Sequence, residues 1–126
     1  MHYQDDYVLH GLSANGYEDG ETILSGTFDS KRISELESII ETYLKHGRYI
    51  SKEEGIGYIT YTINKLCRHS DFWIYCDFTE YELILALYNK GFKLQRNGSS
   101  VVVALNEPSL RKLRSEANRA ERDSHK

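Results

Sequence analysis

The chain contains very little proline and cysteine. One proline and two cysteines, Cys67 and Cys76, occur among its 126 residues. A single proline argues against long structureless linkers, and two cysteines are too few for the disulfide framework of a small secreted domain. The N-terminus lacks the basic segment and apolar run of a signal peptide, and no apolar run approaches the ~20 residues needed to span a bilayer. We therefore predict a cytoplasmic protein with reduced thiols and no membrane partner.

A large net charge is also absent. The formal charge is -3 at pH 7, which argues against a dominant nucleic-acid-binding surface. The distribution is uneven: residues 1–46 hold nine acids and three bases (-6), and residues 47–126 hold ten acids and thirteen bases (+3). The acidic half suits a partner with a basic surface and the basic end suits an anionic one. Alternatively, the two halves neutralise each other within the fold.

Catalytic and cofactor-binding motifs are missing. The sequence has no Gly-x-Ser-x-Gly nucleophile motif and no phosphate loop ending in Gly-Lys-Ser/Thr. Cys67 and His69 are two positions apart and would not face each other on a helix. Together with Cys76 and Asp77 they also lack the paired spacing of a zinc site. We predict no catalytic residue, no metal site and no cofactor.

Four carboxylates nevertheless gather near the middle of the chain: Asp71, Asp77, Glu80 and Glu82. Such a cluster can hold a divalent metal, so a metal-dependent nuclease is one hypothesis. The alternative is structural. Thr79 and Glu82 have the spacing of a capping box, and an acid in the first turn of a helix is favoured by the helix dipole.

The composition is otherwise that of a globular domain, with 40% apolar and 28% charged residues. We predict a single α+β domain over residues 1–120 and a frayed tail over 121–126. The predicted order is β-β-α-α-β-α-β-β-α, with helices packed on a mixed or antiparallel sheet. The predicted elements are strands at 7–12 and 22–28, helices starting at 29–30 and near 51, a strand at 72–78, a helix at 80–90, a hairpin around 97–98, and a helix after Asn106.

Three details of this prediction can be checked directly. Gly47 is expected to end the first helix. Residues 55–63 suit a strand almost as well as a helix, because two glycines and several threonines and tyrosines weaken the helical pattern. The strand 72–78 is expected to bury Phe72, Ile74, Cys76 and Phe78 on one face, and the run Val101–Val103 is expected to lie centrally in a sheet.

Ten tyrosines are more than one core requires, and tyrosine is enriched at recognition surfaces. We therefore predict a small non-enzymatic interaction protein that binds a protein with a basic surface. Small inhibitors and anti-defence proteins of phages and mobile elements work in this way, which is an analogy of size and charge alone. The predicted acidic contact residues are Tyr3, Asp5, Asp6, Tyr17, Glu18, Asp19 and Glu21.

Two other hypotheses remain open. A nucleic-acid-binding accessory protein would use the basic residues of the last helix, Arg111, Lys112, Arg114, Arg119 and Arg122. Self-association as a homo-oligomer would supply the three-valine strand with a second neighbour.

Overall fold

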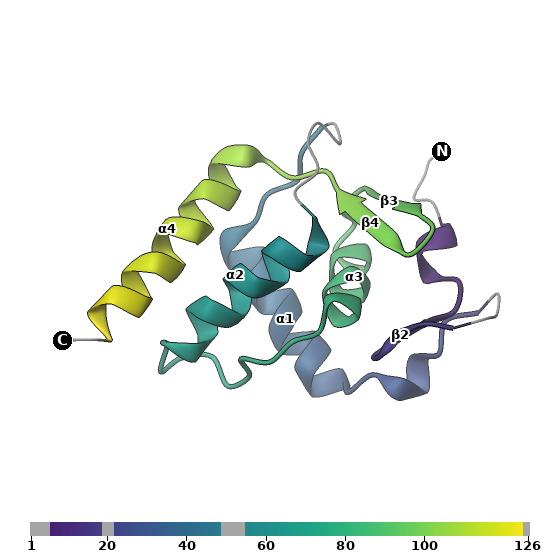
Figure 1. Cartoon of the computed structure of the whole chain (residues 1–126), viewed down its shortest axis with the longest axis horizontal. Helices are drawn as coiled ribbons and strands as arrows, with labels where there is room; N and C mark the ends of the chain where they lie inside the picture. The colour runs from purple at the N-terminus through teal and green to yellow at the C-terminus, as the bar shows by residue number, and fades with distance from the viewer. Residues whose placement is uncertain (1–5, 19–21, 49–54, 125–126) are drawn as a thin grey trace.

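Four α-helices and two small hairpins make up the described part of the chain (Figure 1). The computed structural model describes residues 6–18, 22–48 and 55–124. In chain order the elements are a 3-10 helix Asp6–Leu9, β1 Leu12–Ser13, β2 Gly16–Tyr17, a 3-10 helix Ser25–Thr27, α1 Ser30–Tyr43, α2 Ile56–Arg68, α3 Glu80–Asn89, β3 Leu94–Asn97, β4 Ser100–Val103 and α4 Glu107–Asp123. The predicted α+β class is confirmed.

Three of the helices begin at the residues predicted to cap them. The Asp29 carboxylate accepts a hydrogen bond from Lys31 N (2.8 Å) at the start of α1. Thr79 and Glu82 form the complete capping box of α3, and the Asn106 side chain accepts from Ser109 N (3.0 Å) at α4. Each cap satisfies a backbone N–H that the helix itself leaves without a partner.

Residues 56–68 are helical, which resolves the ambiguity between helix and strand. The helix begins at Ile56, and its predicted start near residue 51 lies outside the described residues. Ile59, Ile63 and Leu66 are buried along one face of α2, so the three-four spacing of its apolar residues outweighs the composition.

The predicted role of Gly47 is wrong. Helix α1 ends at Tyr43, and Leu44 is already extended. Beyond it the chain runs antiparallel to the segment before α4, with Asn106 N donating to the Lys45 carbonyl (3.0 Å). A Cβ atom at Gly47 would lie 2.5 Å from the Leu105 carbonyl oxygen, so glycine is required there for close backbone approach.

The two N-terminal strands are wrongly placed in the prediction. Residues 6–9 form a 3-10 helix, and residues 25–27 form another where the second strand was expected. The strands β1 and β2 lie instead at residues 12–13 and 16–17, as a two-residue antiparallel pair of which only Leu12 falls within a predicted strand.

The second hairpin is confirmed, with its turn shifted by one residue. Asn97 pairs with Ser100, so the two turn residues are Gly98 and Ser99. Gly98 has φ +64 and no described residue other than glycine has a positive φ, which corresponds to a type II′ turn. Among the described residues, the single contact of β4 on the side away from β3 is an isolated β-bridge between Val102 and Gly55. The expected central position of this strand in a larger sheet is therefore wrong.

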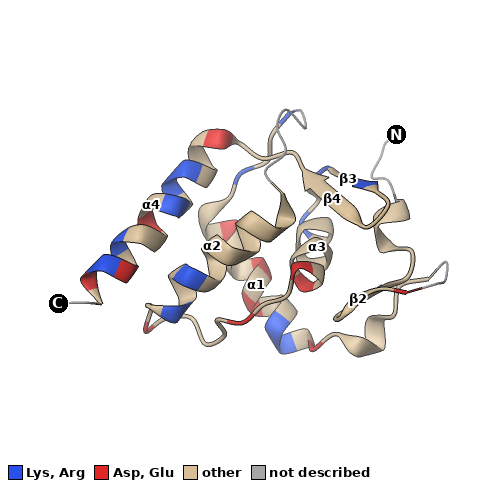
Figure 2. Cartoon of the chain, viewed as in Figure 1, with Lys and Arg blue, Asp and Glu red and all other residues tan. Residues whose placement is uncertain are grey.

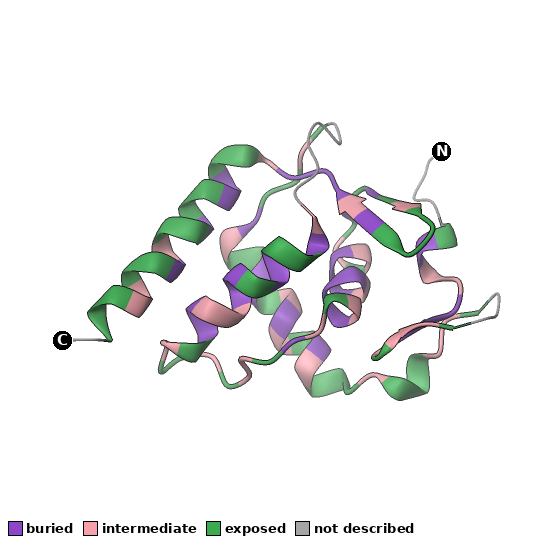
Figure 3. Cartoon of the chain, viewed as in Figure 1, coloured by how far each residue is buried: buried purple, intermediate pink, exposed green. Residues whose placement is uncertain are grey.

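The helices form the core, and the hairpins close one end of it (Figures 1 and 3). Helix α1 packs mainly on α3, and α2 packs mainly on α4. The largest fully buried apolar side chains come from the four α-helices, the first 3-10 helix and β1: Val8, Leu12, Leu36, Ile39, Ile40, Ile59, Ile63, Leu83, Leu87 and Leu113. Helix α4 continues to Asp123, and Lys65 pairs with Glu121 at 3.0 Å, so helical structure extends past the predicted boundary at residue 120.

Candidate functional site

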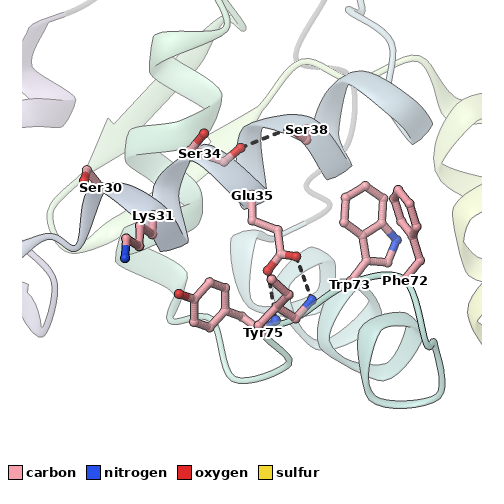
Figure 4. A pocket seen from close by; sticks show the side chains of 9 residues that line it. Ser30, Lys31, Ser34, Glu35, Ser38, Phe72, Trp73 and Tyr75 are labelled. Atoms are coloured by element: carbon pink, nitrogen blue, oxygen red, sulfur yellow. Dashed lines mark hydrogen bonds between the residues drawn. The ribbon is translucent and has the colours of Figure 1, made fainter.

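The segment between α2 and α3 is the largest departure from the prediction. Residues 72–78 form no strand, although their apolar alternation favours one. Their backbone is held by side chains of neighbouring helices instead. Glu35 of α1 accepts hydrogen bonds from Ile74 N (2.6 Å) and Tyr75 N (2.9 Å) (Figure 4). The Glu35 carboxylate takes the place of a partner strand, because it satisfies two backbone N–H donors with charge-assisted hydrogen bonds.

The far end of the same loop is fixed in a similar way. Asn64 of α2 accepts from Phe78 N (2.9 Å) and donates to the Phe78 carbonyl (3.0 Å). One amide side chain thus makes the pair of bonds that a strand residue would make. Both ends of the loop are anchored to rigid helices.

Arg32 joins this loop to α1 and α3. Its guanidinium contacts the carboxylates of Asp77 (2.8 Å) and Glu82 (2.8 and 3.0 Å) and lies over the ring of Tyr75, 5.1 Å from the centroid. The bonds to Glu82 and then to Asp77 raise the pKa of Arg32 further above its usual value, against the effect of burial. The Glu82 side chain is only 4% exposed, so this cation compensates a buried charge.

Because this loop is not a strand, its apolar side chains do not share one buried face. Phe78 is buried as predicted, but Phe72 is 75% exposed and Ile74 is 81% exposed. Trp73 and Tyr75 are half-buried and pack against the core. The predicted burial of Phe72 and Ile74 is therefore wrong.

These side chains form one wall of a groove. The other wall is the exposed face of α1, and the hollow between them has a volume of about 720 Å³. Lys31 and Tyr75 lie at one end, Trp73 and Phe72 at the other, and Glu35 between them (Figure 4). We call this the apolar groove; its lining residues are Ser30, Lys31, Ser34, Glu35, Ser38, Phe72, Trp73, Ile74 and Tyr75. The sequence analysis did not predict this groove. The feature that could have indicated it is the run of four large apolar residues at 72–75, shortly before the capping box of α3.

The structure gives structural roles to two of the four carboxylates in the predicted cluster, Asp77 and Glu82. Asp77 and Glu82 are paired with Arg32, and Glu82 also accepts from Thr79 N (2.9 Å). Within residues 6–18, 22–48 and 55–124, no three His, Cys, Asp or Glu side chains gather as metal ligands would. The hypothesis of a metal-dependent nuclease around Asp71 and Asp77 therefore gains no support from this part of the chain.

The two thiols differ in burial: Cys76 is half-buried and packs against the core, and Cys67 is not an exposed nucleophile. Cys67 is buried, and burial, followed by the nearby charges of Glu35 and Cys76, raises its pKa to about 12. A thiol with so high a pKa carries almost no thiolate at neutral pH, which is the form that reacts.

The predicted acidic contact surface is only partly described. The side chains of Tyr17 and Glu18 are described and that of Asp6 is not; Tyr3, Asp5, Asp19 and Glu21 lie outside the described residues. Tyr17 donates to the Val8 carbonyl (2.7 Å), and the Arg96 guanidinium lies 3.7 Å from its ring centroid. Burial raises the pKa of Tyr17 to about 12. Tyr17 therefore supports the local fold, whereas Glu18 is exposed.

The predicted basic residues all lie on exposed positions of α4, and two of the five are paired with acids of the same helix. Arg111 is 3.8 Å from Glu107, and Arg119 pairs with Glu116. The helix carries five bases and four acids, a net charge of +1, and Figure 2 shows both signs along its length.

Comparisons with family models, with curated proteins and with solved structures found no match to this chain. None of the helices described here has the length and apolar character needed to cross a membrane.

Proposed function

We propose that this chain is a non-enzymatic interaction protein that binds another protein through the apolar groove. The observation that supports this most is the exposure of Phe72 and Ile74 on a loop whose backbone is fixed by Glu35. Two large apolar side chains next to a hollow lose contact with water when a partner covers them. Because the loop is already held in place, little conformational entropy is lost on binding.

The chemistry of the groove suggests what the partner presents. Phe72, Trp73 and Ile74 favour apolar side chains, while the ammonium group of Lys31 at one end favours a carboxylate. As part of the same proposal, the chain is an inhibitor or anti-defence protein of phage or mobile-element origin that acts in the cytoplasm. This is supported by the small size of the chain, its low number of cysteines and its acidic N-terminal part.

The groove and the acidic N-terminal part are competing contact surfaces, and paired variants distinguish them. The groove variant replaces Phe72 and Ile74 with serine, and the acidic-part variant replaces Glu18, Asp19 and Glu21 with lysine. Each is used to capture partners from the native host, with quantification by mass spectrometry. We expect the groove variant to lose at least about tenfold of the captured partner, since apolar anchors at an interface contribute about 2 kcal/mol or more.

The control is the melting temperature of each variant, which should match that of the unmodified chain. Capture that survives the groove variant and fails in the lysine variant would transfer the proposed function to the acidic part. Capture unchanged in both would overturn the proposal altogether.

A further inference from the structure

Helices α2 and α4 together form the positive side of the molecule. Helix α2 contains Lys65 and Arg68 and no acid (+2), and α4 contributes +1, giving +3. The other described residues carry ten acids and seven bases, a net charge of -3. Figure 2 shows basic residues on both helices, which are packed against each other. An anionic partner would be attracted to this side and repelled by the rest.

Contacts between the two helices define how their exposed residues line up. Arg114 Nη1 donates to the Tyr58 hydroxyl (3.1 Å), and Lys65 Nζ donates to Asn118 Oδ1 (2.8 Å). Residue numbers rise in the same direction along both helices, so the helices run parallel. Arg114 therefore lies beside Tyr58, and Arg68 and Arg122 lie toward the same end.

Two exposed tyrosines accompany these cations. Tyr58 is 37% exposed and Tyr61 is 60% exposed. They are three positions apart on α2, which places both rings on one face of the helix. Lys65 Nζ lies 5.9 Å from the Tyr61 ring centroid and keeps the ring beside a positive charge. Neither tyrosine belongs to the buried core.

We infer that this surface binds single-stranded nucleic acid. The tyrosine rings are stacking platforms for unpaired bases, and the arginines beside them contact phosphates. A single strand fits better than a duplex, because the bases of a duplex are already stacked on each other and leave no face for the rings. The inference uses a surface separate from the apolar groove and does not depend on the proposed function.

The structure also changes which residues take part. Tyr58, Tyr61 and Arg68 are added to the predicted set from α4. Lys112 lies on the other flank of α4, beside Thr42 and Tyr43. Arg119 is hydrogen-bonded to Glu116, whereas Arg111 lies 3.8 Å from Glu107, beyond hydrogen-bond distance. The proposed contact residues are Tyr58, Tyr61, Arg68, Arg111, Arg114 and Arg122.

Fluorescence anisotropy with a labelled oligothymidine of about 20 nucleotides tests the inference. We expect saturable binding at low salt that weakens steeply as salt is added. Four arginine–phosphate contacts predict a slope of about -3 for the logarithm of the association constant against the logarithm of salt concentration. Tyr61→Ala should weaken binding by about tenfold, and the double variant Arg114→Ala, Arg122→Ala should reduce the magnitude of the slope by about 1.4.

Two controls make the result specific. Tyr61→Phe keeps the stacking ring and should bind within about twofold of the unmodified chain. Lys31→Ala removes one positive charge at the apolar groove and should leave binding unchanged. No binding at low salt would overturn the inference. An equal loss in Lys31→Ala, or tighter binding of a duplex of the same length, would overturn it as well.

Discussion

Two apolar segments of this chain look alike in sequence and end in different structures. Residues 72–78 and residues 100–105 both have the composition of a strand. The second forms β4, with Val101 and Val103 buried. The first remains a loop that exposes Phe72 and Ile74.

The difference lies in the backbone partner that each segment can reach. The turn at Gly98 and Ser99 brings β3 alongside β4 within a few residues. Residues 72–78 have a helix on each side in the sequence, and their hydrogen-bond partners are the side chains of Glu35 and Asn64. Side-chain partners do not impose the alternation of a sheet, so some apolar residues of the loop can face solvent.

Among substitutions that test the backbone contacts of these two segments, the largest effect is expected from Glu35→Gln. An amide can accept a bond from one of the two loop N–H groups but repels the other with its own N–H groups, and it loses the negative charge. We expect the free energy of unfolding to fall by about 2 kcal/mol. Hydrogen exchange of the Ile74 and Tyr75 amides should accelerate before global unfolding, measured by NMR.

Glu37→Gln is the matched control, because it lies on the same helix and accepts a bond only from the Asn89 side chain (2.9 Å). Its effect should stay within about 0.5 kcal/mol. If both variants leave the loop amides equally protected, Glu35 is not what holds the loop.

A smaller effect is expected from Gly98→Ala, which strains the turn between β3 and β4. Residues 72–78 have no such turn to bring a partner strand alongside them. The φ of +64 at Gly98 disfavours a side chain by about 1–2 kcal/mol, although the space around it is open. Urea unfolding measures the loss. Gly26→Ala is the control, since its φ is not positive and no atom lies within 4 Å of the added Cβ. Equal effects from the two substitutions would show that the turn conformation is not what matters.

The same contrast explains which parts of the fold the sequence could predict. The caps at Asp29, Thr79 and Asn106 were identified because each depends on residues two or three positions away. The loop could not be identified in this way, since Glu35 lies 39 positions from Ile74. The groove was not predicted for the same reason. The basic surface was predicted only on α4, because α2, which contributes the rest of it, is remote from α4 in the sequence.

The smallest effect on stability is expected from Phe72 and Ile74, which the alternating sequence pattern predicts to be buried but which are exposed in the structure. Phe72→Ser and Ile74→Ser remove side chains that are already mostly in water, so each should change the free energy of unfolding by no more than about 0.5 kcal/mol. Phe78→Ala, in the same segment but buried, should cost about 3–5 kcal/mol. Urea unfolding of the three variants gives the comparison directly. Losses of several kcal/mol at Phe72 and Ile74 would mean that these side chains are buried in the native protein, and the groove would then not be available to a partner.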